Sequence, residues 1–293
     1  MLEIQRAIRR FVHKLTGKSK FAFFAVVTMV CIIAISIGIY TQYFYKYSET
    51  DPLMLGINIG SEKTAEELQL LEAEFNSLFT NSLVINSENV NIVEKREETK
   101  DLIYTGYKLE NEDENYYSVK AQIPLFNIET EKANAINKEI VAEFYETANS
   151  IMRQSDQYIV YNVTYAAYIN EHVLSVVIKA SLKEGNKTEK VSLKTYNYSL
   201  PEEKIMTLTD LVALKEVSTE TVQNKITEEI KTAYNNAKII AAEYGNLYER
   251  DLEGEMYKVE NATTFFLTAD GYVYVVYAYG NKDYTNEMDI VIF

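Results

Sequence analysis

The longest uninterrupted apolar stretch of the chain lies close to its N-terminus. Residues 21–40 read FAFFAVVTMVCIIAISIGIY, and none of these twenty residues is charged. A helix rises about 1.5 Å per residue, so the stretch covers ~30 Å, which is the thickness of the hydrocarbon core of a bilayer. The pattern predicts one transmembrane helix over residues 21–41.

The charges before this stretch predict its orientation. Residues 1–20 form a basic tail with six Lys and Arg residues and a single acidic residue, Glu3, for a net charge of +5. Basic residues stay on the cytoplasmic side, so we expect a single-pass cell-membrane protein with its C-terminal part outside. The alternative is a cleaved signal peptide with a weak cleavage site at Ser36-Ile-Gly38. The apolar run is longer than the usual ~7–15 residues of a signal peptide, which favours an uncleaved anchor.

Residues 42–100 are predicted to be a linker that holds one amphipathic helix at about 62–80. Thr64 and Glu67 form a capping box at its start. Apolar residues then recur at helical spacing on one face, namely Leu68, Leu71, Phe75, Leu78 and Phe79.

Residues 101–293 contain blocks of alternating positions and blocks with helical spacing. Strands are predicted at 101–108, 116–123, 158–168, 173–182, 190–198, 264–268, 272–279 and 289–293. Pro124 is expected to end the second strand, and the acidic run 110–115 to form the preceding turn. Helices are predicted at about 130–152, with Thr130 as N-cap, and at about 219–244, between Ser218 and Gly245. Strands and helices are grouped, which is typical of an extracytoplasmic α+β domain with a mostly antiparallel sheet packed with two or three helices.

The charge of the chain limits its partners. The net charge is −14, so removing the +5 tail leaves −19 on the rest, with 23 basic and 42 acidic residues. Nucleic acid is therefore not expected as a partner, because phosphates would be repelled. A cationic partner would suit this charge, although solubility alone also explains it. The single cysteine, Cys31, lies in the apolar stretch, so the outer part has no disulfide.

Three stretches carry a resemblance to a known family. They are residues 123–128 continuing into 135–140, residues 196–200 followed by 206–211, and the stretch FFLTADGYVY at 265–274. In order and spacing they resemble the extracytoplasmic domain shared by the anti-sigma-V factor, a membrane-anchored lysozyme sensor of Gram-positive bacteria, and PdaC-type peptidoglycan deacetylases. The resemblance covers roughly residues 101–293 and implies a cell-envelope domain that binds or senses a ligand. The basic tail is too short for the helical module with which an anti-sigma factor wraps its sigma factor.

Catalytic chemistry has little support in the sequence. The only histidine outside the tail, His172, is expected in an exposed hairpin turn. No HExxH, GxSxG or phosphate-binding glycine loop occurs, so we expect no catalytic residue, no cofactor and no metal. The leading hypothesis is a binding or sensing domain. The alternatives are an accessory domain of a peptidoglycan enzyme and a structural surface protein.

Two segments differ from the resembling family and are the candidates for partner contact. The 183–190 hairpin lacks the family's Gly-Gly-Ala-His segment, and residues 280–286 replace its Pro-Tyr-Ala-x-Gly segment. We expect the membrane as one partner and a cationic cell-wall-associated protein or wall polymer as another. The candidate contact residues are Tyr279, Asp283, Tyr284, Glu184 and Gly185.

Overall fold

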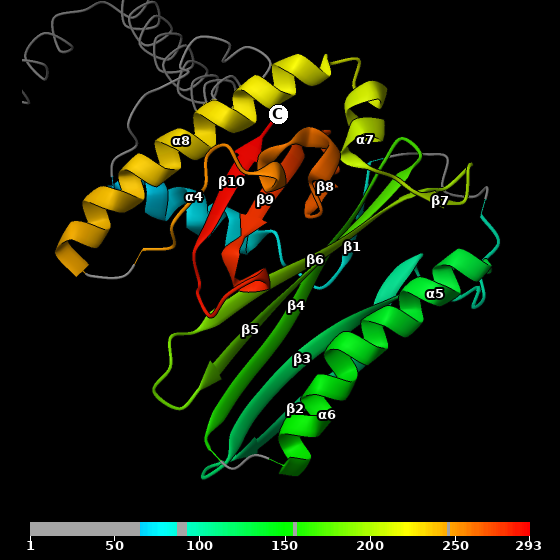
Figure 1. Cartoon of the computed structure of the whole chain (residues 1–293). Helices are drawn as coiled ribbons and strands as arrows, with labels where there is room; N and C mark the ends of the chain where they lie inside the picture. Colours follow the sequence, from blue (N-terminus) through cyan, green and yellow to red (C-terminus); the bar gives the residue numbers. More distant parts are fainter. Residues whose placement is uncertain (1–64, 87–92, 155–156, 245–246) are drawn as a thin grey trace, which may run out of the picture. The chain divides into compact units, whose positions relative to one another are not determined.

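The computed structural model describes residues 65–86, 93–154, 157–244 and 247–293 (Figure 1). They belong to a compact unit spanning Asn58–Phe293. The predicted basic tail and the predicted transmembrane helix at 21–41 lie outside the described residues. Within the described ranges, no helix is both long and apolar enough to cross a bilayer.

The larger of the two sheets in the described part of the chain has seven strands and the order β2-β3-β4-β5-β6-β7, with β1 also paired to β4. Its pairs are antiparallel except β3–β4 and β1–β4, which are parallel and share one edge of β4. The strands are β1 (Leu83–Ile85), β2 (Ile103–Asp113), β3 (Tyr117–Phe126), β4 (Ile159–Asn170), β5 (Val173–Glu184), β6 (Lys190–Ser199) and β7 (Lys204–Ile205). The predicted α+β class with a mostly antiparallel sheet is confirmed.

One face of this sheet is covered by a composite helix made of α5 (Glu131–Ile140), a π-helical turn η3 (Val141–Tyr145) and α6 (Glu146–Gln154) (Figure 1). Thr130 caps its start, accepting a hydrogen bond from the backbone N–H of Ala133. Apolar residues that recur at helical spacing along it are buried, namely Ala133, Ile136, Ile140, Phe144 and Ile151. The helical period of apolar positions therefore located this helix and its buried face.

The other face carries a second sheet of β10 (Met288–Ile292), β9 (Val273–Ala278) and β8 (Phe265–Leu267), in that order and antiparallel. The helices α7 (Leu208–Leu214) and α8 (Thr219–Tyr244) accompany this smaller sheet (Figure 1). Short 3-10 turns lie at η4 (Glu255–Tyr257), η5 (Val259–Asn261) and η6 (Tyr279–Asn281). In total, four helical segments (α4, the composite helix, α7 and α8) accompany the sheets in the described part of the chain, where two or three were expected.

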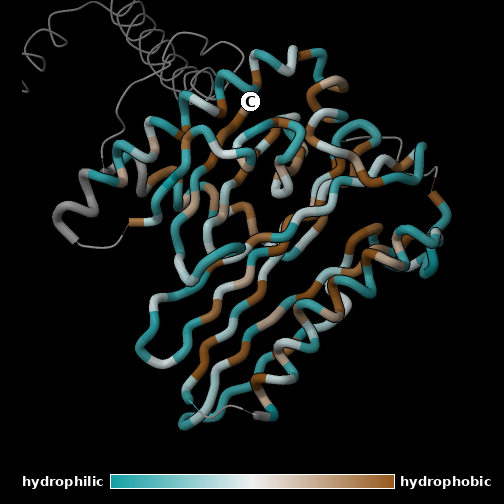
Figure 2. The backbone as a smooth tube through the Cα atoms, viewed as in Figure 1, coloured by the Kyte–Doolittle hydropathy of each residue, from teal (hydrophilic) through white to brown (hydrophobic). Residues whose placement is uncertain are grey.

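The central strands are buried on both faces, since successive residues are buried over 165–170 of β4 and 173–178 of β5. Figure 2 gives the hydropathy of the residues along the backbone. Val163, Tyr165 and Ala167 of β4 belong to the core shared with the composite helix. The intervening Ala166 and Tyr168 belong to another core cluster, which contains residues of the smaller sheet. Strands covered on both sides need apolar residues at successive positions.

The segment expected to be a linker contributes a helix and a strand to the folded unit. In α4 (Ala65–Ser77) and just after it, Phe75 and Phe79 are buried in the cluster that includes Phe266. Residues Leu83–Ile85 form β1 and pair with Ala167–Ile169 of β4. The apolar face of the predicted amphipathic helix therefore packs against the sheets, and the folded unit begins before residue 101.

The hairpin of β2 and β3 differs from the expectation in two ways. Pro124 does not end β3, which continues to Phe126. Pro124 lies opposite Thr105, where the register shifts before Tyr107, and pairing with β4 has already stopped at Ala121. Proline is tolerated at such bulges because no ladder hydrogen bond is required of it. The acidic run is mostly strand and not turn, since β2 extends to Asp113 as the edge of the sheet.

Candidate functional site

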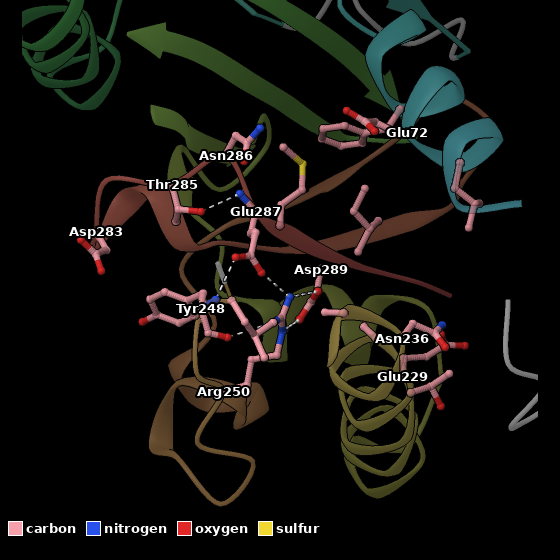
Figure 3. A pocket seen from close by; sticks show the side chains of 18 of the residues that line it. Glu72, Glu229, Asn236, Tyr248, Arg250, Asp283, Thr285, Asn286, Glu287 and Asp289 are labelled. Atoms are coloured by element: carbon pink, nitrogen blue, oxygen red, sulfur yellow. Dashed lines mark hydrogen bonds and ion pairs between the residues drawn. The ribbon is translucent and has the colours of Figure 1, made fainter. Parts of the chain in front are cut away.

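A pocket of about 670 Å³ lies between α4, α8 and the segment that leads into β10 (Figure 3). Helix α4 contributes Leu71, Glu72 and Phe75 to its lining, and α8 contributes Glu229, Thr232, Ala233, Asn236 and Ala237. The remaining lining residues are Thr188, Leu247, Tyr248, Arg250 and residues 283–290.

Local capping and the apolar period of α8 set the position of its pocket-lining residues. The Ser218 hydroxyl accepts a hydrogen bond from the backbone N–H of Thr221 at 3.1 Å, which starts the helix. Val222, Ile226 and Ile230 are buried in the core with the smaller sheet. This anchors one side of the helix and leaves Glu229 and Asn236 beside the pocket.

Arg250 forms a buried ion-pair cluster in the pocket wall (Figure 3). Its Nε lies 2.7 Å from Oδ2 of Asp289 and its Nη2 lies 3.0 Å from Oδ1, a two-pronged pair. Nη2 is also 3.2 Å from Oε2 of Glu287, and Nη1 donates to the Tyr248 carbonyl at 3.0 Å. Burial alone would lower the pKa of Arg250, but the Asp289 carboxylate outweighs it and raises the pKa. The guanidinium is therefore charged, and each of its three nitrogens contacts an oxygen.

Tyrosines enclose this cluster. The Tyr279 hydroxyl donates a hydrogen bond to Oδ2 of Asp289, and its oxygen lies 3.0 Å from that of Tyr257. The Tyr248 ring stacks on the Tyr279 ring with 4.3 Å between centroids, and Arg250 lies 4.8 Å from the same ring. Burial and the Asp289 carboxylate raise the pKa of Tyr279. Tyr279 was a candidate for partner contact, but its side chain is buried and supports the Arg250 cluster instead.

The pocket carries an excess of negative charge. Among the described residues, five carboxylates line it, those of Glu72, Glu229, Asp283, Glu287 and Asp289, against one cationic side chain, Arg250. The described part of the lining therefore has a formal charge of −4, even after Arg250 is counted. Clefts lined by one sign of charge concentrate ions of the opposite sign. This arrangement favours a cationic ligand.

Asn236 brings an uncharged side-chain amide to the pocket (Figure 3). Its residue is 6% exposed, and its side-chain Nδ2 has no hydrogen-bond partner within the described part of the chain. A buried amide donor without a partner costs about 1–3 kcal/mol, so native proteins rarely retain one. The wall of the pocket thus contains an enclosed amide donor that has no acceptor among the described residues.

The two segments predicted to contact a partner lie side by side. The backbone N–H of Val191 donates to the Thr285 carbonyl at 3.0 Å, joining the start of β6 to the 283–287 loop. In the β5–β6 hairpin, Lys187 Nζ lies 2.6 Å from Oε2 of Glu184 and 5.3 Å from the Tyr284 ring centroid. The Lys187 hydrogen bond lowers the pKa of Glu184, whereas burial and the Glu184 carboxylate raise that of Tyr284.

The candidate residues therefore separate into two groups. Asp283 and Tyr284 line the pocket, and Glu184 lies next to Tyr284 without lining it. Gly185 has a φ of +48° in the hairpin turn, where glycine is favoured, and also lies outside the lining. Its role is in the turn.

A glycine allows the close approach of the hairpin and the loop. A Cβ built on Gly280 would lie 1.8 Å from the Val191 carbonyl oxygen and 2.7 Å from the Thr285 carbonyl oxygen. Any side chain at this position would push the two backbones apart. The loop that holds Asp283 and Tyr284 is thus positioned by backbone packing.

Sequence reasoning did not identify Asn236, Arg250 or Asp289, although two of them left a signal. Asp289 alternates with Val291 on the buried side of β10, and an acidic residue at an inward strand position needs a partner. Asn236 follows Ala233 by three residues, a helical spacing that places its amide on the same side of α8 as this apolar residue. Arg250 left no such signal, because its partner is 39 residues away in the chain.

Comparisons with known proteins gave structural likeness only. No protein-family model matches the chain, and no curated protein matches it. A solved structure of a DUF3298 family protein from Pseudomonas aeruginosa PAO1 is similar with a TM-score of 0.37 and 14% identity, over 63% of this chain and 84% of that one. A DUF3298 family member from Bacteroides fragilis NCTC 9343 is similar with a TM-score of 0.32 and 11% identity, over 60% and 80% of the two chains.

Proposed function

We propose that this protein is a membrane-anchored, extracytoplasmic binding domain whose pocket takes a cationic ligand from the cell envelope. The observation that supports this most directly is the pocket of about 670 Å³, whose described lining residues include five carboxylates and a single guanidinium. The apolar stretch at 21–40 and the basic residues before it support the anchored, outward-facing arrangement.

The Arg250 guanidinium does not neutralise the negative charge of the pocket lining. Arg250 contacts Asp289 and Glu287 and has a side chain that is only 3% exposed, so it belongs to the wall of the pocket. Glu72 and Asp283 come from α4 and from the loop before β10, outside the Arg250 cluster. A cation placed between these elements would gain electrostatic attraction without displacing Arg250.

Binding is proposed in preference to catalysis because of the residue types in the lining. No Ser, Cys, His or Lys is found among the residues that line the described pocket. These are the usual nucleophiles and bases at neutral pH, apart from carboxylates. Carboxylates without such residues beside them can bind a cation as well as take part in catalysis.

The test uses the full chain in detergent and a fluorescein-labelled tetralysine peptide, with affinity measured by fluorescence anisotropy at about 0.15 M salt. The double variant Glu72→Gln with Asp283→Asn removes two pocket charges and leaves the Arg250 cluster intact. The matched control, Glu110→Gln with Glu112→Gln, removes two charges from the exposed edge strand β2. We expect the pocket variant to weaken binding about tenfold or more and the control to change it less than about twofold.

Equal weakening by both double variants would mean that the peptide adheres through net charge alone, and the proposed site would be wrong. Anchoring is tested separately by adding protease to intact protoplasts. The proposal expects removal of everything beyond about residue 45 and protection of the N-terminal tail. A soluble secreted form that begins near Ile39 would contradict it.

A further inference from the structure

The strand β2 has one unpaired side within the described part of the chain. It is the last strand of the larger sheet, and its eleven residues pair with β3 on one side only. An edge strand of this length presents a row of backbone N–H and C=O groups to which another strand can add. We infer that this edge pairs with β2 of a second copy of the chain, so that the two larger sheets join into one.

The charges along β2 favour one register for this pair. Two copies related by a twofold axis pair antiparallel, and one residue of the strand lies on the axis opposite itself. With Leu109 on the axis, Lys108 of each copy lies opposite Glu110 of the other, and two ion pairs form. An axis at Lys108, Glu110 or Asn111 would place like charges directly opposite each other, and an axis at Tyr107 gives no ion pair.

The same register also extends the apolar face of the sheet. Tyr107 and Leu109 are partly buried against the core cluster that the composite helix covers, whereas Lys108 and Glu110 are exposed. Successive residues of a strand point to opposite faces, so the two Leu109 side chains would meet on the helix-covered face and the ion pairs would form on the other. Each face of the joined sheet thus gains a favourable contact.

A second copy fits this edge better than a strand of unrelated sequence. Glu110 already lies opposite Lys120 of β3 within its own copy. In the joined sheet, Lys120, Glu110 and Lys108 of the second copy would form a row of alternating charge. An unrelated strand would need a basic and an acidic residue two positions apart in matching order, and a second copy always supplies both.

The first experiment is disulfide cross-linking of the full chain in detergent, with Cys31→Ser as the background so that no native thiol remains. Leu109→Cys places one thiol of each copy on the proposed axis. Directly opposite Cα atoms in an antiparallel pair are about 4.5–5.5 Å apart, within the ~4.4–6.8 Å range of a disulfide. We expect a covalent dimer after oxidation with copper phenanthroline.

The matched control for cross-linking is Glu112→Cys on the same strand. Residue 112 is three positions from the axis, so its two copies would lie roughly 20 Å apart at about 3.4 Å per residue. This variant should remain uncross-linked. Cross-linking of Glu112→Cys without cross-linking of Leu109→Cys would overturn the proposed register.

The second experiment measures dimerisation by sedimentation velocity at about 0.15 M salt, where the net negative charge of the copies is screened beyond ~8 Å. Lys108→Glu and Glu110→Lys each turn both ion pairs into repulsive pairs, so each variant alone should dimerise about tenfold more weakly. An equimolar mixture of the two should recover dimerisation, because an acidic strand then faces a basic one. Lys132→Glu, at an exposed position of α5, changes the net charge equally and should alter dimerisation less than about twofold.

Three results would overturn the inference. A chain that stays monomeric at every concentration would mean that the charges of β2 keep the edge unpaired. A dimer that persists unchanged in Lys108→Glu and Glu110→Lys would be held by another surface. Cross-linking of Leu109→Cys to a different protein in intact cells, without a dimer of the chain itself, would assign the edge to a foreign strand.

Discussion

The Asp289→Ala substitution tests the buried ion-pair cluster most sharply. The Arg250 side chain is 3% exposed and that of Asp289 is 5% exposed, so the pair is almost entirely removed from water. Asp289 accepts two hydrogen bonds from Arg250 and one from the Tyr279 hydroxyl. Its removal leaves a buried guanidinium whose remaining partners are Glu287 and the Tyr248 carbonyl.

The expected magnitude follows from these contacts. Removing one partner of a buried ion pair costs about 3–5 kcal/mol, because the other charge stays buried without compensation. Glu287 reaches Nη2 of Arg250 at 3.2 Å, but its side chain is 26% exposed and compensates only in part. We therefore expect Asp289→Ala to lower the free energy of unfolding by about 3–4 kcal/mol.

The assay is urea unfolding of residues 58–293, the compact unit, followed by circular dichroism. With a slope of about 3 kcal/mol per molar urea, the midpoint should fall by about 1 M. The double variant Arg250→Met with Asp289→Leu removes both charges, and such replacements are often neutral or stabilising. It should therefore be more stable than Asp289→Ala. A loss below about 1 kcal/mol for Asp289→Ala, or a double variant no more stable than it, would refute the reasoning.

Three further predictions concern other parts of the fold. Phe75→Ala should cost about 3–5 kcal/mol in urea unfolding, because Phe75 is 2% exposed, whereas Leu70→Ala, at a position 62% exposed, should cost little. Gly280→Ala should lower the thermal midpoint by more than about 5 °C, since its Cβ would meet the Val191 carbonyl oxygen, and an unchanged midpoint would contradict that geometry. The Thr207 backbone N–H and hydroxyl lower the pKa of Asp210 below its usual 3.8, so its stabilising effect is present above pH 3.8 and disappears as pH falls through the lower, folded-state pKa. Asp210→Asn should accordingly be less stable than the wild type in urea unfolding at pH 7, and the difference should shrink as the pH falls below 3.8.

The elements with strong periodicity could be predicted from the sequence. Helix α8 has the predicted bounds, Thr219–Tyr244, because a long apolar stripe and the Ser218 cap agree. Strands β5 and β6 begin at the predicted residues Val173 and Lys190. In these segments local propensity and tertiary packing favour the same structure.

Short or edge elements could not be predicted in the same way. Helix α7 has seven residues, which are too few to show a helical period of apolar positions. Its capping box of Thr207 and Asp210 is the sequence feature that indicates a helix here. Strand β1 has three residues and pairs with a strand that lies about eighty positions later in the chain. In the edge strand β2, the residues Glu110 and Glu112 keep strand geometry although their composition suggested a turn, since an exposed edge accepts charged side chains.

The candidate site was located only in part for a similar reason. Asp283 and Tyr284 line the pocket, and their loop does lie beside the hairpin of Glu184. The Arg250–Asp289 pair and the Asn236 amide depend on contacts between α8, the 247–250 segment and β10. One sequence does not reveal such pairings, because side chains that meet only in the folded state leave no local pattern.

The packing of α4 and β1 has a consequence for the order in which the chain can fold. Phe75 contacts Tyr274, about two hundred residues later, and β1 pairs with a strand that follows β2, β3 and the composite helix. The first elements of the unit to leave the ribosome are thus among the last to find their partners. Contacts of such long sequence separation slow folding and keep apolar surface exposed in the meantime. During synthesis, the amphipathic face of α4 is therefore the surface most in need of protection until β8, β9 and β10 are complete.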